Sequence, residues 1–386
     1  MRVVQINIFP NLSTGSIMMN IHKHLQKVGI ESYVVWGRGR KALNNNEIYM
    51  NDKAGVYYHA LYTRITDKTG FASKRATKKL IKKLEFIKPD IVHLHNIHGY
   101  YINIELLFEY FKKNDIKVVW TLHDCWSFTG HCAYFDSVGC NKWKTQCEKC
   151  PLIKEYPKSI IDNSKWNYLK KMQLFNCINL HIVTPSKWLA NLVKESYLKD
   201  YPVFVINNGI NTNIFKYTNS NFKEKYNLIG KKIILGVAST WDKRKGLDDF
   251  IKLSKVISDD YKIVLVGLTK KQMSDLPKNI LGLERTKNVD ELVEIYSASD
   301  ILFNPTREDN YPTVNLEALS CGIPVVTYDT GGSPEVITNN NGLVTTFDYF
   351  VKKYSDIINK KYDFLNECDF SLEKMTKQYE ELYKNI

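Results

Sequence analysis

Short apolar runs separated by longer amphipathic segments recur along the chain. Five runs lie at residues 2–9, 31–37, 90–96, 117–124 and 180–186, and four more at 232–239, 261–267, 300–306 and 323–329. Strands that are apolar on both faces and alternate with helices are typical of parallel sheets covered by helices on both sides. The pattern therefore predicts an α/β fold of doubly wound, Rossmann-like sheets.

The pattern restarts in the segment VFVINNGINTNIF, residues 203–215, where a polar turn follows a strand. A chain of 386 residues also exceeds what a single hydrophobic core usually covers. We therefore expect two domains, 1–205 and 206–368, which face each other across a cleft and bind ligands beyond the carboxyl ends of their strands. A final helix with a serine N-cap is expected within residues 369–386.

The chain is basic, with 54 Lys and Arg against 41 Asp and Glu and a formal net charge of +13. Such a surplus favours partners that carry phosphate, including phosphorylated substrates, anionic lipids and nucleic acids. A nucleic-acid module is disfavoured because the most basic segment, residues 74–88, has one aromatic residue, Phe86. Its apolar residues form one helical stripe, which favours a solvated outer face over a docking surface for anionic lipid.

The N-terminal segment lacks the long apolar centre of a signal peptide, because Gln5 and Asn7 interrupt it. No window approaches the roughly 18 uninterrupted apolar residues that a membrane span needs. We therefore expect a cytoplasmic protein, with a peripheral position at the inner face of the plasma membrane as one option. The eight cysteines should then stay reduced.

Acidic residues surround a predicted helix start in REDNYPTVNLE, residues 307–317. Pro312 suits the first turn of a helix, so we expect the helix to begin there and the amides of Thr313 and Val314 to attract an anion. Glu317 has apolar helical neighbours, a setting that an ion tolerates only with a partner. The alternative makes Asp309 or Asn310 a helix cap and Glu317 a surface residue.

Polar residues also follow predicted strands in the first half. The run VVWTLHD ends in His123 and Asp124, and a histidine at such a strand end is either catalytic or structural. The run DIVHLHN ends in His95 and Asn96, which either bind the acceptor or satisfy the polar end of the strand. Gly15 and Ser16 lie in LSTGS after the first strand, which is a weak signal for a phosphate loop.

Four cysteines lie within a short insertion expected at residues 125–151. Their arrangement, with one Cys-x-x-Cys pair, fits a tetrahedral structural zinc site as well as it fits reduced thiols that pack the insertion. A filled shell of four sulfur ligands would leave no position for substrate. The candidate ligands are Cys132, Cys140, Cys147 and Cys150.

The order DNYPTVNLEALSCGIPVVT, followed by GGSPE, resembles the nucleotide-sugar signature of family-4 retaining glycosyltransferases of the GT-B fold. The resemblance extends along almost the whole chain. It implies that Asp309 binds hydroxyls of the donor sugar, that Glu317 binds the ribose hydroxyls, and that Lys245 with Arg244 binds the donor diphosphate. Fixed positive charge and a helix N-terminus can stabilise a diphosphate leaving group without a catalytic metal.

The resemblance also extends to the first half of the chain. It implies that His123 contacts the donor sugar near the reacting centre, so that His123, Asp309 and Glu317 are the candidate catalytic residues. It further implies that Gly15 and Ser16 approach the donor phosphate, and that the last helix crosses back to the first domain. Relatives that make capsular and exopolysaccharides carry similar cysteine-rich insertions.

These observations predict a retaining transferase that moves a hexosyl or N-acetylhexosaminyl group from a nucleoside-diphosphate sugar to a saccharide. The expected acceptor is a lipid-linked oligosaccharide of capsule, exopolysaccharide or O-antigen synthesis, reached at an anionic membrane surface. The alternatives are a nucleotide-sugar epimerase and a non-catalytic sugar-binding protein of the same fold.

Overall fold

The computed structural model describes residues 1–50, 52–176, 178–364 and 370–386, which form two compact units. Unit 1 comprises Met1–Asn207 and Met375–Ile386, and unit 2 comprises Asn208–Lys374. The chain therefore passes from unit 1 to unit 2 two residues after the boundary expected at 205. The boundary expected at 368 lies outside the described residues.

Unit 1 is built on a seven-stranded sheet in the order β3-β2-β1-β4-β5-β6-β7, in which all neighbours pair in parallel. Its strands are β1 (Arg2–Asn7), β2 (Glu31–Trp36), β3 (Glu47–Tyr49), β4 (Ile91–Leu94), β5 (Lys117–Thr121), β6 (Leu180–Thr184) and β7 (Val203–Val205). The central strands are buried along nearly their whole length, as their uninterrupted apolar sequences predict.

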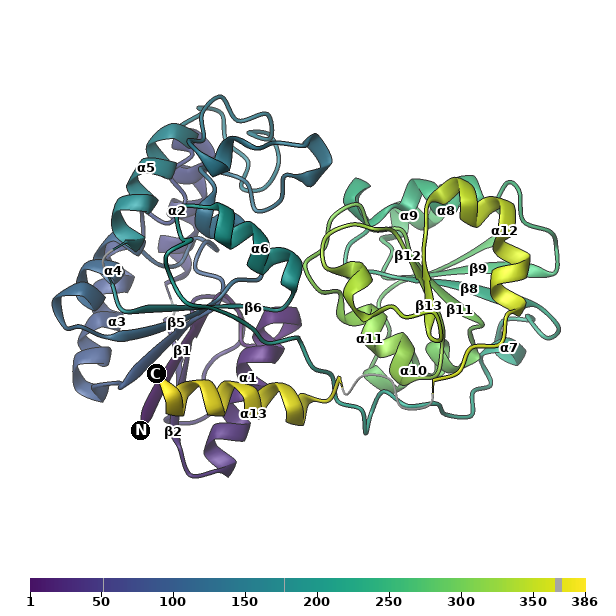
Figure 1. Ribbon diagram of the computed structural model, residues 1–386, viewed down its shortest axis with the longest axis horizontal. Helices are drawn as coiled ribbons and strands as arrows, with labels where there is room; N and C mark the ends of the chain where they lie inside the picture. Colours follow the sequence, from purple (N-terminus) through teal and green to yellow (C-terminus); the bar gives the residue numbers. More distant parts are fainter. Residues whose placement is uncertain (51, 177, 365–369) are drawn as a thin grey trace. The chain divides into compact units, whose positions relative to one another are not determined.

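Helices lie on both sides of this sheet (Figure 1). They are α1 (Leu12–Lys27), α2 (Lys53–Thr66), α3 (Lys74–Ile87), α4 (Ile104–Lys113), α5 (Ser164–Phe175), α6 (Lys187–Glu195) and α13 (Leu372–Asn385). Helix α3 buries Ala76, Leu80, Leu84 and Ile87, which confirms the predicted apolar stripe. The expected serine cap of α13 is Ser371, whose hydroxyl accepts a hydrogen bond from the Lys374 amide at 3.2 Å.

Unit 2 is built on a six-stranded parallel sheet in the order β10-β9-β8-β11-β12-β13. Its strands are β8 (Lys232–Val237), β9 (Tyr261–Val266), β10 (Ile280–Leu283), β11 (Ile301–Asn304), β12 (Val325–Thr327) and β13 (Gly342–Val344). Its α-helices are α7 (Phe222–Lys225), α8 (Leu247–Leu253), α9 (Lys270–Ser274), α10 (Val289–Ala298), α11 (Thr313–Ser320) and α12 (Phe347–Asn359). Hydrophobic clusters lie on both faces of the sheet, one against α10 and α11 and one against α8 and α12.

The two parallel α/β units confirm the predicted fold class. Strand order reverses between β1 and β4 in unit 1 and between β8 and β11 in unit 2. Ligands of doubly wound sheets bind beyond the carboxyl ends of the strands at such switch points. The segments that follow these strands are therefore the places to look for a site.

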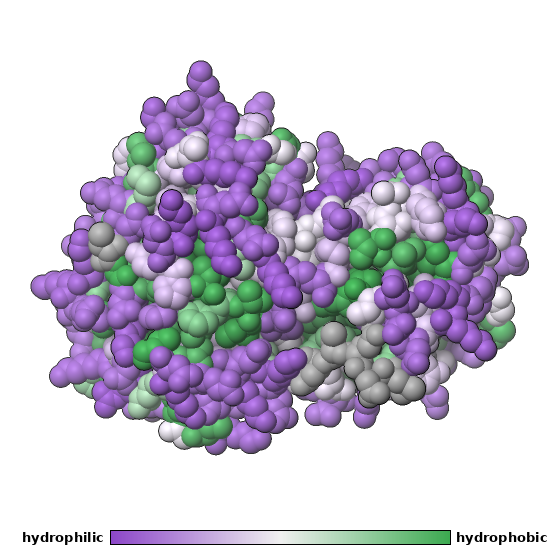
Figure 2. All heavy atoms as spheres, in the orientation of Figure 1, coloured by the Kyte–Doolittle hydropathy of each residue, from purple (hydrophilic) through white to green (hydrophobic). Residues whose placement is uncertain are grey.

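The surface of the visible face is mostly hydrophilic, with smaller areas of hydrophobic residues (Figure 2). None of the helices among the described residues combines the length and the apolar character that crossing a membrane requires.

Candidate active site

The segment between β11 and α11 adopts the helix start that its sequence predicts, displaced by one residue. Pro312 has φ −68° and ψ 117°, so it is extended and the helix begins at Thr313. The first-turn amides of a helix have no partner within it and carry the positive end of its dipole. Thr313 and Val314 supply two of these amides, and Glu317 lies in the second turn.

A short 3-10 helix, η4 (Lys243–Lys245), brings two cations to this helix start. The Asp242 side chain caps η4 by accepting the Lys245 amide at 3.0 Å. Gly246 follows with φ 74°, and a Cβ there would lie 2.4 Å from the Pro305 carbonyl oxygen. Only glycine therefore lets this turn pack against the end of β11.

Both cations, Lys245 and Arg244, lie close to the carboxylate of Asp309. Its Oδ2 accepts a hydrogen bond from Lys245 Nζ, and Arg244 Nη1 lies 4.0 Å from the same oxygen. Burial alone would raise the pKa of Asp309, but the charges of Lys245 and Arg244 hold it below its usual value. Asp309 is therefore ionised at neutral pH, and the three side chains form one charged cluster.

The loop that precedes a short 3-10 helix, η5 (Ser333–Val336), fixes the backbone of Asp309. The Gly332 amide donates to the Asp309 carbonyl at 3.0 Å. Gly331 has φ 58°, and a Cβ there would lie 1.9 Å from the same oxygen. The GGSPE segment that carries the family resemblance therefore holds Asp309 in place through its backbone.

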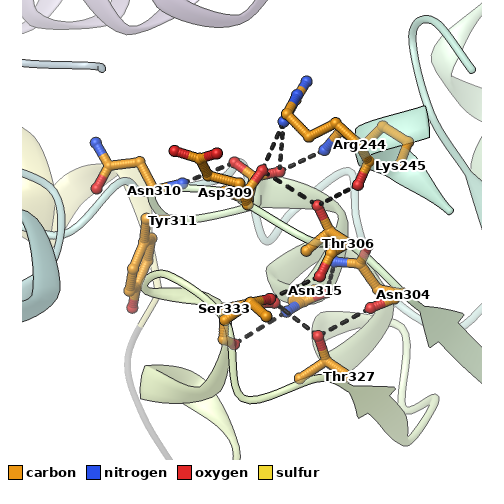
Figure 3. Close-up of polar contacts among 12 residues, drawn as sticks. Arg244, Lys245, Asn304, Thr306, Asp309, Asn310, Tyr311, Asn315, Thr327 and Ser333 are labelled. Atoms are coloured by element: carbon orange, nitrogen blue, oxygen red, sulfur yellow. Dashed lines mark hydrogen bonds and ion pairs between the residues drawn. The ribbon is translucent and has the colours of Figure 1, made fainter. Parts of the chain in front are cut away.

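Buried polar side chains tie this loop to β11, α11 and β12 (Figure 3). Asn304 Nδ2 donates to Asn315 Oδ1 at 2.9 Å, and Asn315 Nδ2 donates to the Ser333 carbonyl at 3.2 Å. Thr327 Oγ1 lies 2.7 Å from Ser333 Oγ and donates to the Asn304 carbonyl at 2.9 Å. This network is not apparent from the sequence, where its signal is polar residues at strand ends and on the inner side of a helix.

Glu317 has the partner that its apolar setting requires. Tyr296 of α10, which is fully buried, donates its hydroxyl to Glu317 Oε2 at 2.9 Å. Burial raises the pKa of Glu317, and hydrogen bonds from the Tyr296 and Thr313 hydroxyls partly offset that rise. Glu317 is half-buried rather than a free surface residue.

Glu308 differs from the other two acids of the segment. It is 1% exposed, although it has no role in the sequence-based site. Its backbone carbonyl accepts hydrogen bonds from Arg244 Nη1 at 2.8 Å and from Thr306 Oγ1 at 3.3 Å. Glu308 thus holds Arg244 beside Asp309 through its main chain.

In unit 1, histidines gather after β4 and β5. His95 Nδ1 and His123 Nε2 share a hydrogen bond of 3.0 Å, and His95 Nε2 lies 3.2 Å from Gln5 Oε1 of β1. Burial lowers the pKa of His123 to about 4, so its ring is neutral at pH 7. His123 is half-buried, whereas His95 is 1% exposed and both of its ring nitrogens are engaged.

The residues beside these histidines are also held by hydrogen bonds. The Asn96 amide donates to Asn7 Oδ1 at 3.2 Å, and the Asn96 side chain is half-buried. His98 Nε2 lies 2.9 Å from Asp124 Oδ2. Burial would raise the pKa of Asp124, but the nearby His98 and the Trp126 amide lower it below its usual value.

Gly15 and Ser16 lie in the first turns of α1, directly after the loop that follows β1. A Cβ at Gly15 would lie 2.5 Å from the Phe9 carbonyl oxygen, so only glycine allows the loop and the helix to approach this closely. Ser16 is exposed at the same helix end.

The four candidate zinc ligands are free thiols that line one narrow cavity of ≈ 10 Å³ together with His131. His131 Nδ1 pairs with Asp67 Oδ1, and its buried Nε2 has no hydrogen-bond partner in the part of the chain that the structure describes. A carboxylate behind a histidine is the usual second partner of a metal-bound imidazole. Across the described residues, however, no group of three or more His, Cys, Asp or Glu is already arranged to hold a metal ion.

The structure thus brings Arg244, Lys245 and Asp309 together in unit 2, at the start of the helix that carries Glu317. In unit 1 it joins His95 to His123 and places Asn96 after the same strand as His95. Unit 2 therefore offers fixed cations, helix amides and two carboxylates, which suits a ligand with a phosphate group and several hydroxyls. Unit 1 offers a neutral histidine.

Comparison with known proteins agrees with this chemistry. Residues 15–214 match the model described as Glycosyltransferase Family 4, and residues 218–384 match Glycosyl transferases group 1. The putative colanic acid biosynthesis glycosyl transferase WcaC of Escherichia coli is 27% identical over 369 residues, covering 89% of this chain and 86% of WcaC.

Two solved structures share the fold over the whole chain. A glycosyltransferase of Rickettsia africae has a TM-score of 0.67 at 16% identity and covers 100% of this chain and 98% of its own. Anabaena HepE in complex with UDP-glucose has a TM-score of 0.64 at 13% identity, with 100% of both chains covered.

Proposed function

The chain belongs to the family-4 glycosyltransferases and has their GT-B fold, and from this premise we propose that it transfers a sugar from a nucleoside-diphosphate sugar with retention of configuration. The observation that carries the proposal is the cluster of Lys245, Arg244 and Asp309 at the start of α11. It brings cations for a diphosphate, carried by η4, beside a carboxylate for sugar hydroxyls, carried by the loop between β11 and α11. HepE, a protein of the same fold, was solved with UDP-glucose, which supports a nucleotide-sugar donor.

In the proposed donor complex, the diphosphate accepts hydrogen bonds from Lys245, Arg244 and the amides of Thr313 and Val314. Charge-assisted bonds of this kind are about twice as strong as neutral ones. Glu317, held by Tyr296, accepts hydrogen bonds from the ribose hydroxyls. Asp309 accepts hydrogen bonds from the hydroxyls of the transferred sugar.

The same groups act on the reaction when the glycosidic bond to phosphate breaks. Negative charge then grows on the diphosphate, and fixed cations stabilise it without reorganisation of solvent. The leaving diphosphate takes the proton of the incoming hydroxyl, which attacks from the same face of the sugar. Retention follows from that geometry without a covalent intermediate on the enzyme.

His123 is proposed to contact the transferred sugar near the reacting carbon. His95 does not contact the sugar and instead orients the His123 ring through their shared hydrogen bond. Both nitrogens of His95 are engaged, which argues against the direct acceptor contact expected from the sequence. We therefore assign His95 a positioning role, and we keep Asn96 as the acceptor residue. Gly15 and Ser16 are proposed to line the donor phosphate from the start of α1.

The acceptor is proposed to be a lipid-linked saccharide of bacterial surface polysaccharide synthesis, elongated by a hexosyl or N-acetylhexosaminyl group. The name of the similar WcaC protein places that relative in colanic acid biosynthesis. A lipid-linked acceptor would require the enzyme to work at a membrane surface, and the net charge of +13 is complementary to anionic lipid.

Zinc binding by Cys132, Cys140, Cys147 and Cys150 is proposed as a brace of the insertion after β5. The thiols line a cavity of about one water-sized sphere, and His131 lines the same cavity. The thiols would have to turn toward a common centre, because they are not arranged for a metal as they stand. Zinc there would stabilise the insertion and have no part in the sugar transfer.

The proposal is tested in two steps with the full chain. A thermal-shift screen of nucleoside diphosphates and their sugars identifies the donor, because a ligand that binds only the folded state raises its stability. Transfer to a saccharide acceptor is then followed by NMR of the new anomeric centre. A product with inverted configuration would contradict the proposed mechanism, and conversion of the donor alone would show an epimerase instead.

A further inference from the structure

Exposed hydrophobic side chains gather on one part of unit 1. Helix α2 buries His59 and Thr63 on its inner side. Its outer side presents Tyr57 at 77%, Leu61 at 59% and Ile65 at 44% exposure. These three residues are spaced by four and therefore lie in one row along the helix. Tyr58, at 63% exposure, stacks on Tyr62 beside the row.

A second segment extends this row. The Ile160 amide donates to the Arg64 carbonyl at 2.8 Å, and the Ser159 hydroxyl lies 3.3 Å from the same oxygen, so residues 159–161 lie at the end of α2. Ile160 and Ile161 are 75% and 49% exposed. Lys68, just after α2, lies 4.3 Å from the ring centroid of the exposed Trp166. We call the row on α2 together with Ile160, Ile161 and Trp166 the α2 face.

Three cations lie at the edge of the α2 face, and one exposed acid, Asp162, follows Ile161 there. Lys53 is the first residue of α2, Arg64 lies in its last turn, and Lys158 lies two residues before Ile160. All three side chains are exposed. Among the described residues, none of these three forms an ion pair. Long cationic side chains can lay their carbon stems along apolar surface and keep their charge at the polar boundary.

The composition of the α2 face fits a lipid surface better than a second copy of this chain. Apolar and aromatic side chains with a rim of Lys and Arg are the pattern of elements that lie in the interface of an anionic bilayer. A second copy would bring the same cations against this rim, and like charges brought together oppose binding. The occupant is therefore an anionic phospholipid membrane.

We propose that the α2 face inserts its apolar side chains into the headgroup boundary of an anionic membrane, while Lys53, Arg64 and Lys158 contact lipid phosphates. This proposal rests on the proposed function in that a lipid-linked acceptor requires such a surface. It replaces the expectation that any lipid contact would involve the basic outer face of α3. That face carries Lys78, Lys79, Lys82 and Lys83 with a single exposed aromatic, Phe86, and no apolar row.

Vesicle flotation of the full chain tests the proposal without donor or acceptor. Wild-type protein should float with vesicles that contain equal parts phosphatidylglycerol and phosphatidylcholine, and not with phosphatidylcholine alone. The double substitution Leu61→Ser with Ile160→Ser should lower the bound fraction more than about tenfold, because two side chains lose insertion. Arg64→Glu with Lys158→Glu should lower it comparably at low salt.

Matched controls separate this face from general surface effects. Val256→Ser with Tyr349→Ser removes two side chains of unit 2 that are 52% and 53% exposed, and it should leave flotation unchanged. Lys78→Glu with Lys82→Glu changes the charge of the α3 face, and flotation of this variant should stay close to that of wild type because α3 does not contact the lipid in this proposal. The proposal is overturned if the Leu61 and Ile160 variant floats like wild type, or if its only defect is loss of a dimer in light scattering.

Failure of this proposal can be distinguished from failure of the proposed function. The Leu61 and Ile160 variant should keep the thermal shift with the nucleoside diphosphate that stabilises wild type, because neither residue belongs to the donor cluster. A chain that binds vesicles but no nucleotide would contradict the proposed function alone. A chain that binds nucleotide but no anionic vesicle would contradict the α2 face alone.

Discussion

The substitution Asp309→Asn should separate binding of the diphosphate from transfer of the sugar. It keeps the shape of the side chain and removes the charge that Lys245 Nζ and Arg244 Nη1 face. In the donor-free protein, Asp309 partly neutralises the two cations. A diphosphate must compete with it for them, so the substitution should strengthen binding of a nucleoside diphosphate while weakening the reaction.

The size of the effect follows from the geometry of the cluster. At the 4.0 Å between Arg244 Nη1 and Asp309 Oδ2, the gross attraction is about 4 kcal/mol at an effective dielectric constant near 20. Most of it is offset by desolvation, which leaves a net value near 1 kcal/mol as in other partly exposed pairs. Release of that amount corresponds to binding about fivefold tighter.

Loss of transfer should be larger than this gain. A hydrogen bond from a sugar hydroxyl to a charged acceptor contributes about 1.5–3 kcal/mol, which is about 10- to 150-fold in kcat/KM. Calorimetry with UDP, GDP and ADP and initial rates with the matching sugar donor measure the two effects. Asp309→Glu is the control, since it keeps the carboxylate that accepts the sugar hydroxyls, and it should retain transfer.

Two results would refute this account of the cluster. If Asp309→Asn weakened nucleoside-diphosphate binding, Asp309 would be holding the cations in a productive position rather than competing for them. If it left transfer unchanged, Asp309 would not bind the sugar. Lys245→Met should weaken diphosphate binding and transfer together.

Three further outcomes follow from the structure. Glu317→Gln should weaken donor binding by about 30- to 150-fold in calorimetry, because loss of a charged hydrogen-bond acceptor costs about 2–3 kcal/mol, whereas Tyr296→Phe should change it far less. Burial lowers the pKa of His59 from 6.5 to about 3, so the folded state excludes a proton that the unfolded state binds below pH 6.5. Stability of wild type should then fall on acidification by about 1.4 kcal/mol per pH unit more than that of His59→Asn in urea melts, and equal slopes would contradict this. The purified chain should contain about one zinc per chain by elemental analysis and lose thermal stability with Cys147→Ser, whereas four titratable thiols without zinc would favour reduced cysteines that pack the insertion.

Much of the fold could be predicted because its central strands are buried on both faces. Such strands have continuous apolar sequences, and every strand expected from these runs is present. Strands β3, β10 and β13 were missed, and all three lie at sheet edges. They are short or, as with ILGL in β10, carry a glycine, so the sequence alone gives little periodicity there.

The candidate site could be predicted only as separate segments. Lys245 and Asp309 are 64 residues apart, so their pairing depends on how Gly246 and Gly331 pack against neighbouring backbone. The hydrogen bond between His95 and His123 likewise joins two strands, and the sequence assigned these histidines to different roles. A pattern along the chain records which residue types are present, but their contacts are set by tertiary packing.

The membership of α13 in unit 1 has a consequence for how the protein is made. The Tyr383 hydroxyl of this helix lies 2.6 Å from His93 Nδ1, and the Tyr379 hydroxyl lies 2.9 Å from Thr121 Oγ1. These residues leave the ribosome only after all of unit 2 has been synthesised. Until α13 packs, His93 and Thr121 therefore lack the tyrosine hydroxyls that contact them in the folded protein.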